Sequence, residues 1–143
     1  MKQNPSRLKY KKNHKPAYSN LYLAEQKNFY SMKGTLVSKS IENGRLTYQQ
    51  IEACRKTIRR ILKKQGIVYL RVFTNISITK KPLASRMGKG KGSHYLWICV
   101  IKKGQAICEI VFSIKNTLNL GLKALKSASS KLPFKTNIFF NYY

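Results

Sequence analysis

The residues best suited to contact another molecule form one short run, Arg86-Met87-Gly88-Lys89-Gly90-Lys91-Gly92. Its three glycines remove side chains and allow positive φ, so a partner can approach the backbone closely. The two interleaved lysines, with the arginine in front, give that close approach an anionic target. The run is therefore predicted to lie against a phosphate-rich surface.

The overall charge identifies this surface as nucleic acid. The chain of 143 residues holds 29 Lys+Arg and only 4 acidic residues, for a net charge of +25. Such a charge is self-repelling, whereas binding to a polyanion removes the repulsion and releases counterions. Because 43% of the residues are hydrophobic, the chain is not a disordered basic tail. A secreted cationic or membrane-disrupting protein is the alternative, but no signal peptide or long apolar segment is visible, so no membrane insertion is expected.

Two further groups of cations extend the predicted basic surface. Residues 1–20 are expected to form an extended arm that orders against nucleic acid. The cations singled out in it are Arg7, Lys9, Lys11, Lys12 and Lys15. A helix is predicted from Thr47, because Thr47 and Gln50 fit a capping box and apolar residues follow at helical spacing as far as Gly66. Its remaining positions are largely cationic and are expected to face RNA, with a solvated helix face as the alternative. They are Arg55, Lys56, Arg59, Arg60, Lys63 and Lys64.

Catalytic and metal chemistry find little support in the sequence. The glycine run lacks the spacing of a nucleotide-binding P-loop, and no carboxylate accompanies it. His14 and His94 are the only histidines, and neither has metal ligands at a suitable spacing. The three cysteines, Cys54, Cys99 and Cys108, form no C-x-x-C pair, so we expect buried free thiols in a reducing compartment. No cofactor and no metal site are predicted.

The order of predicted elements places these residues in an α+β fold with a mixed or antiparallel sheet and two helices. Strands are expected over residues 32–41, 67–73, 95–101, 106–112 and 134–140, and a second helix over 115–130. Residues 102–105 are read as a hairpin turn between two of these strands, and 75–81 as an extended link. The apolar stripe of the second helix is assigned to Leu118, Leu122, Leu125 and Ala128 or Ser129. The domain organisation is then an arm over residues 1–20 and one domain over 21–143, with a long loop at 80–94.

Four stretches of sequence also follow one another in a recognisable order. The basic opening covers residues 7–15 and includes His14, and Gly44-Arg45-Leu46-Thr47 with Gln50-Ile51-Glu52-Ala53 leads into the first long helix. Arg71-Val72-Phe73, Lys81-Pro82 and the run 86–92 come next, and Lys131-Leu132-Pro133 with Lys135-Thr136 closes the series. In this order and spacing the chain resembles the L-sixteen family of large-subunit ribosomal proteins, in its bacterial and organellar branch. It departs from the family at 18–31, which has no glycine, and at 113–117, which has no acidic residue.

The resemblance implies a structural protein of the large ribosomal subunit, not an enzyme, with a hammerhead-type sandwich fold. It implies large-subunit ribosomal RNA, A-site tRNA and neighbouring ribosomal proteins as partners, and no homo-oligomer. The expected rRNA-binding residues are Arg7, Lys9, Lys11, Lys12, His14, Lys15, Arg45, Arg55, Arg59, Arg60, Lys63, Arg71 and Lys135. The expected tRNA-proximal loop consists of Arg86, Met87, Gly88, Lys89, Gly90, Lys91 and Gly92. A free RNA-binding factor for assembly or splicing is the alternative function.

Residue usage bears on the origin of the chain. Lys outnumbers Arg by 22 to 7, and Asn, Ile, Phe and Tyr are abundant, which is typical of AT-rich codons. Because the basic opening begins at residue 7, we expect no cleavable presequence before it. We therefore expect a mitochondrial ribosome, with a plastid or a bacterium with an AT-rich genome as alternatives.

Overall fold

A computed structural model describes residues 4–5, 8–14, 36–88, 90–112 and 118–140, which contain seven strands and two helices. The elements are β1 (Leu36–Ser40), β2 (Gly44–Thr47), α1 (Tyr48–Leu62), β3 (Gly66–Leu70), β4 (Ile76–Lys80), β5 (Ser93–Ile101), β6 (Ala106–Phe112), α2 (Leu118–Ser129) and β7 (Thr136–Phe140). This confirms the predicted α+β class. The part of the arm at residues 8–14 has neither helix nor strand.

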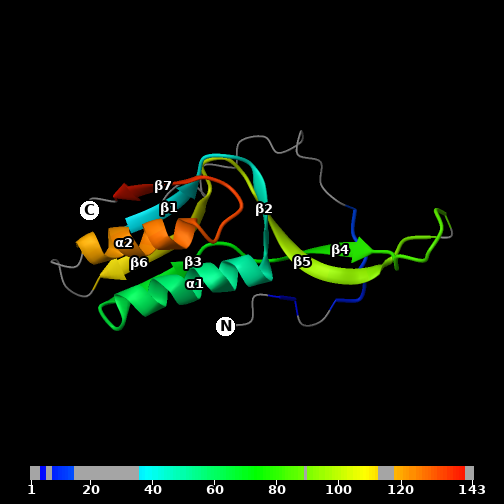
Figure 1. Cartoon of the computed structure of the whole chain (residues 1–143), viewed down its shortest axis with the longest axis horizontal. Helices are drawn as coiled ribbons and strands as arrows, with labels where there is room; N and C mark the ends of the chain where they lie inside the picture. The colour runs from blue at the N-terminus through cyan, green and yellow to red at the C-terminus, as the bar shows by residue number, and fades with distance from the viewer. Residues whose placement is uncertain (1–3, 6–7, 15–35, 89, 113–117, 141–143) are drawn as a thin grey trace.

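The strands form two separate antiparallel sheets. The larger sheet has the order β3-β6-β1-β7, and the smaller has the order β2-β5-β4. Figure 1 shows α1 and α2 side by side against the larger sheet, while β4 and β5 extend away from this body and carry the loop at their far end. The fold is therefore a helix-covered body with a two-stranded projection.

The predicted hairpin between residues 95–101 and 106–112 is wrong, because the two strands belong to different sheets. β5 pairs with β2 and β4, whereas β6 pairs with β1 and β3. The turn itself forms, and the Gln105 N–H donates to the Lys102 carbonyl at 3.1 Å. The end of β1 holds this turn, since Gly104 N–H donates to the Ser40 carbonyl (2.8 Å) and Ser40 N–H donates to the Gln105 carbonyl (3.0 Å). The turn thus passes the chain from one sheet to the other.

Two short strands were not predicted. Residues 44–47, expected only to lead into the helix, form β2 and place Leu46 opposite Cys99 of β5. Residues 76–80, expected to be an extended link, form β4 and place Ile76 opposite Ile98. Both segments are short, and pairing with β5, distant in the chain, stabilises each of them. β3, by contrast, ends at Leu70 and not at Phe73.

The prediction for α1 is confirmed at its start. Thr47 is the N-cap, with Gln50 N–H donating to its Oγ1 at 3.3 Å and its own N–H donating to Gln50 Oε1 at 2.9 Å. The predicted apolar face is buried at Ile51, Cys54, Ile58 and Leu62. The helix ends at Leu62, earlier than the predicted stop at Gly66, because Lys63 takes a positive φ of 53°.

The predicted apolar stripe of α2 is confirmed at Leu125 and Ala128 but not at Leu118 and Leu122. Its buried residues are Gly121, Ala124, Leu125 and Ala128, whereas Leu118 is exposed and Leu122 half-buried. A Cβ on Gly121 would lie 2.1 Å from the Phe112 ring and 2.7 Å from Leu36. The helix therefore approaches the sheet through small residues, which a search for leucines at helical spacing overlooks.

The packed side chains form two adjoining clusters. In the first, α1 and α2 pack on the larger sheet, with Cys54 and Ile58 against Cys108 and Ile110. In the second, Ile51 of α1 meets residues of both sheets, among them Cys99 of β5 and Ile107 of β6. The prediction of buried free cysteines is confirmed for all three. The start of α1 thus joins the body to the projection.

This junction predicts a measurable effect of the helix cap. Thr47→Ala removes the side-chain acceptor of the capping box and should lower the free energy of unfolding by about 1 kcal/mol. Denaturant unfolding at high salt, which screens the positive charge, measures this loss. Thr57→Ala is the matched control, because the Thr57 hydroxyl only donates to the Ala53 carbonyl inside the same helix. Equal effects of the two changes would contradict a specific role of the cap.

Candidate nucleic-acid interface

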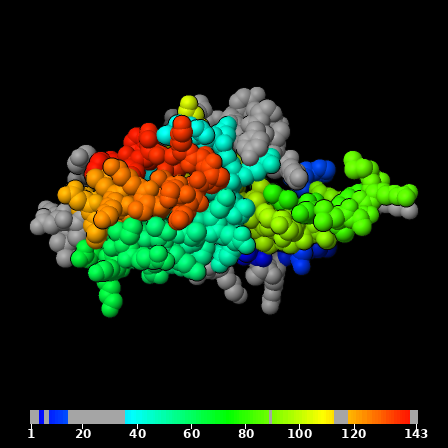
Figure 2. All heavy atoms as spheres, in the orientation of Figure 1, coloured from blue at the N-terminus to red at the C-terminus, as the bar shows by residue number. Residues whose placement is uncertain are grey.

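The glycine and lysine loop lies at the far end of the projection formed by β4 and β5. In Figures 1 and 2 it is the narrow end of the molecule, away from the helices. Its residues 82–88, 90 and 91 are exposed, and the side chains of Leu83 and Met87 reach 100% and 97% exposure. A loop this open makes few contacts with its own domain, so its side chains are available to a partner.

The three glycines of the loop differ in what they do. Gly88 and Gly90 have φ of +92° and +91°, and a Cβ at either position would meet nothing within 4 Å. They shape the turn and leave its backbone open to another molecule. Gly92, expected to serve the same purpose, instead lies against the neighbouring strand, where a Cβ would be 2.5 Å from the Lys80 carbonyl oxygen. Gly92 is therefore required by the packing of the loop stem.

The structure brings the basic arm beside the loop stem. Lys12 Nζ donates to the Lys91 carbonyl at 3.1 Å, and Lys91 Nζ donates in return to the Asn13 carbonyl. At the start of the arm, the buried Thr74 donates from Oγ1 to Asn4 Oδ1 at 2.7 Å. Each ammonium has three N–H donors, so these bonds leave both lysines able to contact phosphate.

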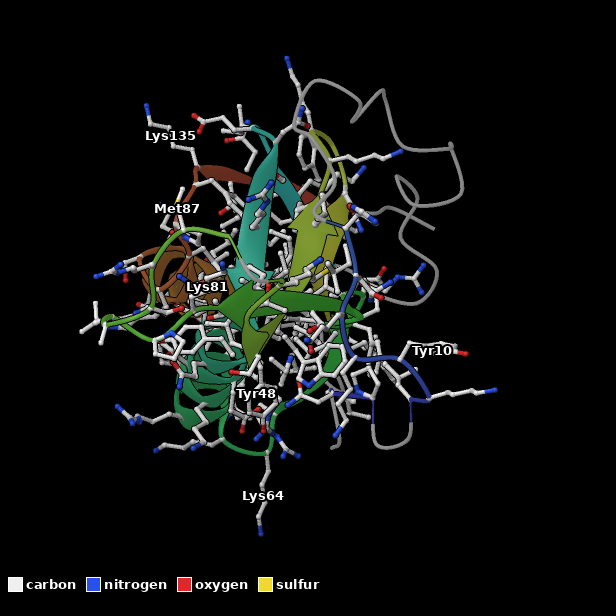
Figure 3. The ribbon with its side chains drawn as sticks, turned by 90° about the vertical axis from the view of Figure 1, so that its right-hand side faces the viewer. Tyr10, Tyr48, Lys64, Lys81, Met87 and Lys135 are labelled. Carbon is white, nitrogen blue, oxygen red and sulfur yellow. The ribbon has the colours of Figure 1, made fainter. Side chains whose placement is uncertain are left out.

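This arrangement makes the arm and the loop one basic region. Its exposed members are Lys9, Lys11, Lys12, His14, Lys80, Arg86 and Lys91. Figure 3, which views the molecule from the loop end, shows Tyr10 of the arm and Lys81 and Met87 of the loop around the β4–β5 pair. The predicted site residues Arg7, Lys15 and Lys89 lie outside the described part of the chain.

The cations of α1 form a second basic region. Arg59, Arg60 and Lys63 are exposed near the C-terminal end of the helix, which Figure 1 places at the opposite end of the molecule from the loop. Arg55 differs, because it pairs with Glu52 (Nη2–Oε1, 2.5 Å; Nε–Oε2, 2.9 Å). This hydrogen-bonded pair lowers the pKa of the Glu52 carboxyl and raises that of Arg55. Arg55 is thus already partly neutralised within the helix.

Arg71 has a structural partner that its sequence position did not indicate. Its Nε lies 3.2 Å from Oε1 of Glu109, a carboxylate that is only 1% exposed in β6. An unpaired carboxylate at such a site is costly, so the guanidinium stabilises the fold whether or not it also meets RNA. Arg71 lies just beyond the end of β3, where its N–H donates to the Ile107 carbonyl at 2.9 Å.

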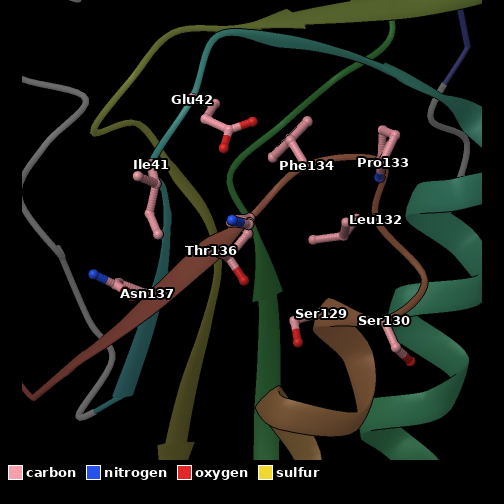
Figure 4. Close-up of a pocket in the computed structure, with 10 residues that line it drawn as sticks. Ile41, Glu42, Ser129, Ser130, Leu132, Pro133, Phe134, Thr136 and Asn137 are labelled. Atoms are coloured by element: carbon pink, nitrogen blue, oxygen red, sulfur yellow. The ribbon is translucent and has the colours of Figure 1, made fainter.

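The last two predicted contacts lie apart from these regions. Arg45 is half-buried in β2, while Lys135 is exposed before β7. Lys135 lines a hollow of about 610 Å³ between the end of α2 and β7, with Leu132, Pro133 and Phe134 along one side (Figure 4). Glu42 lines the hollow as well, so charges of both signs meet there.

A smaller hollow at the foot of the projection was missed by sequence reasoning. It measures about 340 Å³ and lies between the arm, the start of α1 and β5. Its lining includes Tyr48, His94, Tyr95 and Trp97. These aromatic residues come from two segments that are far apart in the chain. The sequence predicted a strand at Trp97 and no role for its ring.

The described residues offer little catalytic chemistry. Burial raises the pKa of the Cys99 thiol, and a hydrogen bond with Cys54 together with burial raises that of Cys108. Among these residues no group of three or more His, Cys, Asp or Glu side chains could hold a metal ion. In the same part of the chain, neither helix has the length and apolar character to cross a membrane.

Comparison with known proteins gives a consistent match over most of the chain. A family model described as "Ribosomal protein L16p/L10e" matches residues 5–139. A protein named "Large ribosomal subunit protein uL16" from Buchnera aphidicola is 44% identical over 132 residues, which cover 92% of each chain. Proteins of the same name from Acinetobacter baumannii and Psychrobacter arcticus are 42% and 43% identical over 134 residues, covering 94% of this chain and 93% of theirs.

The ion pair of Arg71 predicts an effect on stability. Arg71→Ala leaves the Glu109 carboxylate without its cation and should lower the free energy of unfolding by roughly 2–3 kcal/mol. Arg59→Ala, at an exposed position of α1, should change it by no more than about 0.5 kcal/mol. Urea unfolding of both variants at one salt concentration makes the comparison, and equal losses would refute the structural role of Arg71.

Proposed function

Because the chain belongs to the ribosomal protein L16p/L10e family, we propose that it binds large-subunit rRNA and presents its loop to A-site tRNA. It is a structural constituent of the large ribosomal subunit and not an enzyme, with rRNA and other ribosomal proteins as partners. The proposal concerns which surfaces carry out the binding. The observation that carries it is the projecting loop, whose exposed cations and open glycines lie far from the core.

Phosphate contacts by the two basic regions form the first part of the proposal. The exposed lysines and arginines of the arm and of α1 offer charge–charge contacts to a polyanion, and arginines add forked hydrogen bonds. Lys9, Lys11 and Lys12 serve one region, and Arg59, Arg60 and Lys63 the other. Since these regions lie at opposite ends of the molecule, rRNA segments on two sides would hold the protein in the subunit.

Positioning of tRNA by the loop is the second part of the proposal. Arg86 and Met87 are exposed at the loop end, and Lys81 Nζ donates to the Gly88 carbonyl across the base of the turn. That bond stabilises the loop stem while leaving its tip exposed. The backbone at Gly88 and Gly90 can approach the backbone of a bound tRNA closely, because neither residue carries a side chain.

The location of the ribosome is a further part of the proposal. The lysine- and asparagine-rich residue usage supports a mitochondrial ribosome, while the relatives named above are bacterial. Fractionation of the source cells decides between a mitochondrion, a plastid and the cytoplasm of a bacterium with an AT-rich genome. Recovery of the chain outside mitochondria would refute this part of the proposal.

Sedimentation tests whether the chain works within the subunit. In a lysate centrifuged through a high-salt sucrose gradient, we expect mass spectrometry to find the chain in stoichiometric amount with the mature large subunit. A chain that remains at the top of the gradient, or travels only with precursor particles, would instead be a free RNA-binding factor for assembly or splicing.

A charge reversal in the loop tests the role of its tip. Arg86→Glu should leave the free energy of unfolding within about 0.5 kcal/mol, because the side chain is exposed. It should weaken A-site tRNA binding to large subunits assembled with the variant, or slow the last step of their assembly. Lys123→Glu, an exposed change of the same charge on α2, is the matched control. Equal behaviour of the two variants in tRNA binding and in subunit profile would contradict the proposal.

A further inference from the structure

The hollow at the foot of the projection has aromatic walls. It is lined by Asn4 of the arm, Thr47, Tyr48 and Gln49 at the start of α1, and His94, Tyr95, Leu96 and Trp97 of β5. Its volume of about 340 Å³ falls at the lower end of the range for small-ligand pockets, about 300–1,000 Å³. Figure 3 shows Tyr48 below the β4–β5 pair, on the side of the molecule seen from the loop end.

An irregularity in the sheet places two of these rings together. The pairing of β4 with β5 shifts between Ile78 and Thr79, so that Thr79 lies opposite His94 and Tyr95 is the extra residue. Such a bulge changes which face of the strand later residues occupy. As a result the His94 and Trp97 rings meet, with centroids 4.7 Å apart and planes tilted by 45°.

The rings are also held in place by buried groups. The hydroxyl of Ser77, a buried residue of β4, lies 2.7 Å from Nδ1 of His94 and fixes the orientation of the imidazole. On the arm side, Thr74 of the β3–β4 connection is buried and binds Asn4. Buried hydroxyl groups thus hold two lining residues of the pocket, His94 on β5 and Asn4 on the arm.

The charge around the pocket suits an anionic polymer. No carboxylate is among the lining residues that the structure describes, and Lys80 Nζ lies 5.3 Å from the ring centroid of Tyr95. The arm that supplies Asn4 also carries Lys9, Lys11 and Lys12. Lys80 therefore lies beside one ring of the pocket and further cations lie in the arm, while the lining itself consists largely of aromatic rings and amides.

We propose that this pocket holds one unpaired nucleobase of large-subunit rRNA. Proteins recognise bases that leave an RNA stack by placing them on aromatic rings and pairing their edges with polar groups. Here Tyr95 and Trp97 provide rings, the amides of Asn4 and Gln49 provide donors and acceptors, and the nearby lysines take the adjoining phosphates. This inference rests on the proposed function, because it requires rRNA beside the projection.

The chain carries its own reporter for this site. Trp97 is its single tryptophan, so intrinsic tryptophan fluorescence reports on the pocket alone. We expect an RNA octamer of adenosine to quench this fluorescence, whereas an abasic octamer with the same number of phosphates binds without quenching. Equal quenching by both octamers, or quenching by neither, would overturn the proposal.

Two matched substitutions distinguish base stacking in the pocket from the general attraction between the positive protein and RNA phosphates. Tyr95→Ala, at a side chain 59% exposed, removes a pocket ring and should weaken binding of the adenosine octamer roughly tenfold, with abasic binding unchanged. Phe139→Ala is the control, because Phe139 is 46% exposed and also lies under a lysine, with Lys39 Nζ 5.0 Å from its ring centroid, but in the other sheet. Equal weakening by the two changes, or no effect of Tyr95→Ala, would refute a base-specific pocket. Circular dichroism verifies that both variants are folded.

Ultraviolet cross-linking of intact large subunits gives the decisive result. We expect a peptide containing His94, Tyr95 or Trp97 to be joined to one rRNA nucleotide. Cross-links from the loop and arm without any from this peptide would refute the pocket while leaving the proposed function intact. Absence of the chain from the subunit in the sedimentation experiment would instead refute the proposed function itself.

Discussion

The strong excess of positive charge is the constraint on which the rest of this structure depends. A net charge of +25 opposes any compact state, so the cations must be spread over the surface. The few carboxylates can then each pair with a cation. Among the described residues, Glu52 and Glu109 each pair with an arginine. In the second pair the carboxylate is buried and the arginine is partly exposed, and the pair joins β6 to the end of β3. Most of the other cations in the described part of the chain are exposed, where the proposed contacts with rRNA would neutralise them.

The separation of the strands into two sheets determines the shape of the molecule. The body buries its apolar side chains between the larger sheet and two helices, and β4 and β5 of the smaller sheet extend outwards as a projection. The turn at 102–105 makes the division possible, because β1 rather than β5 receives the returning strand. The loop thereby lies away from the body. Although the protein folds around its core, the tip of this loop makes few contacts with the rest of the chain.

Local signals in the sequence predicted a large part of this arrangement. Some predictions depend only on residues that are neighbours in the sequence, and the structure confirms them. They are the capping box at Thr47, the apolar face of α1 and the existence of strands at β5 and β6. The sheet partners of β5 and β6 depend on contacts far apart in the chain, and the predicted hairpin was wrong. Leu125 and Ala128 of α2 were predicted correctly, but Gly121 was missed, since close packing there requires a small residue that weakens the helix pattern.

The features of the candidate site likewise fall into those that the sequence predicted and those that depend on contacts distant in the chain. Residue types alone indicated the loop, the arm and the cations of α1. They did not indicate that Lys12 and Lys91 join the arm to the loop stem, nor that Arg71 pairs with Glu109. The aromatic pocket was missed altogether, because its rings come together only through a bulge in β5 and the approach of α1.

The reciprocal lysine bonds between arm and loop stem have a consequence for how binding proceeds. Since Lys12 and Lys91 each hold the other's segment, an RNA strand bound by the arm, as proposed, would meet the loop as a neighbour on the same molecule. The second contact then forms at a high effective concentration and no longer as an independent encounter. The proposed contacts of the arm and of the loop would thereby combine as in a bivalent ligand.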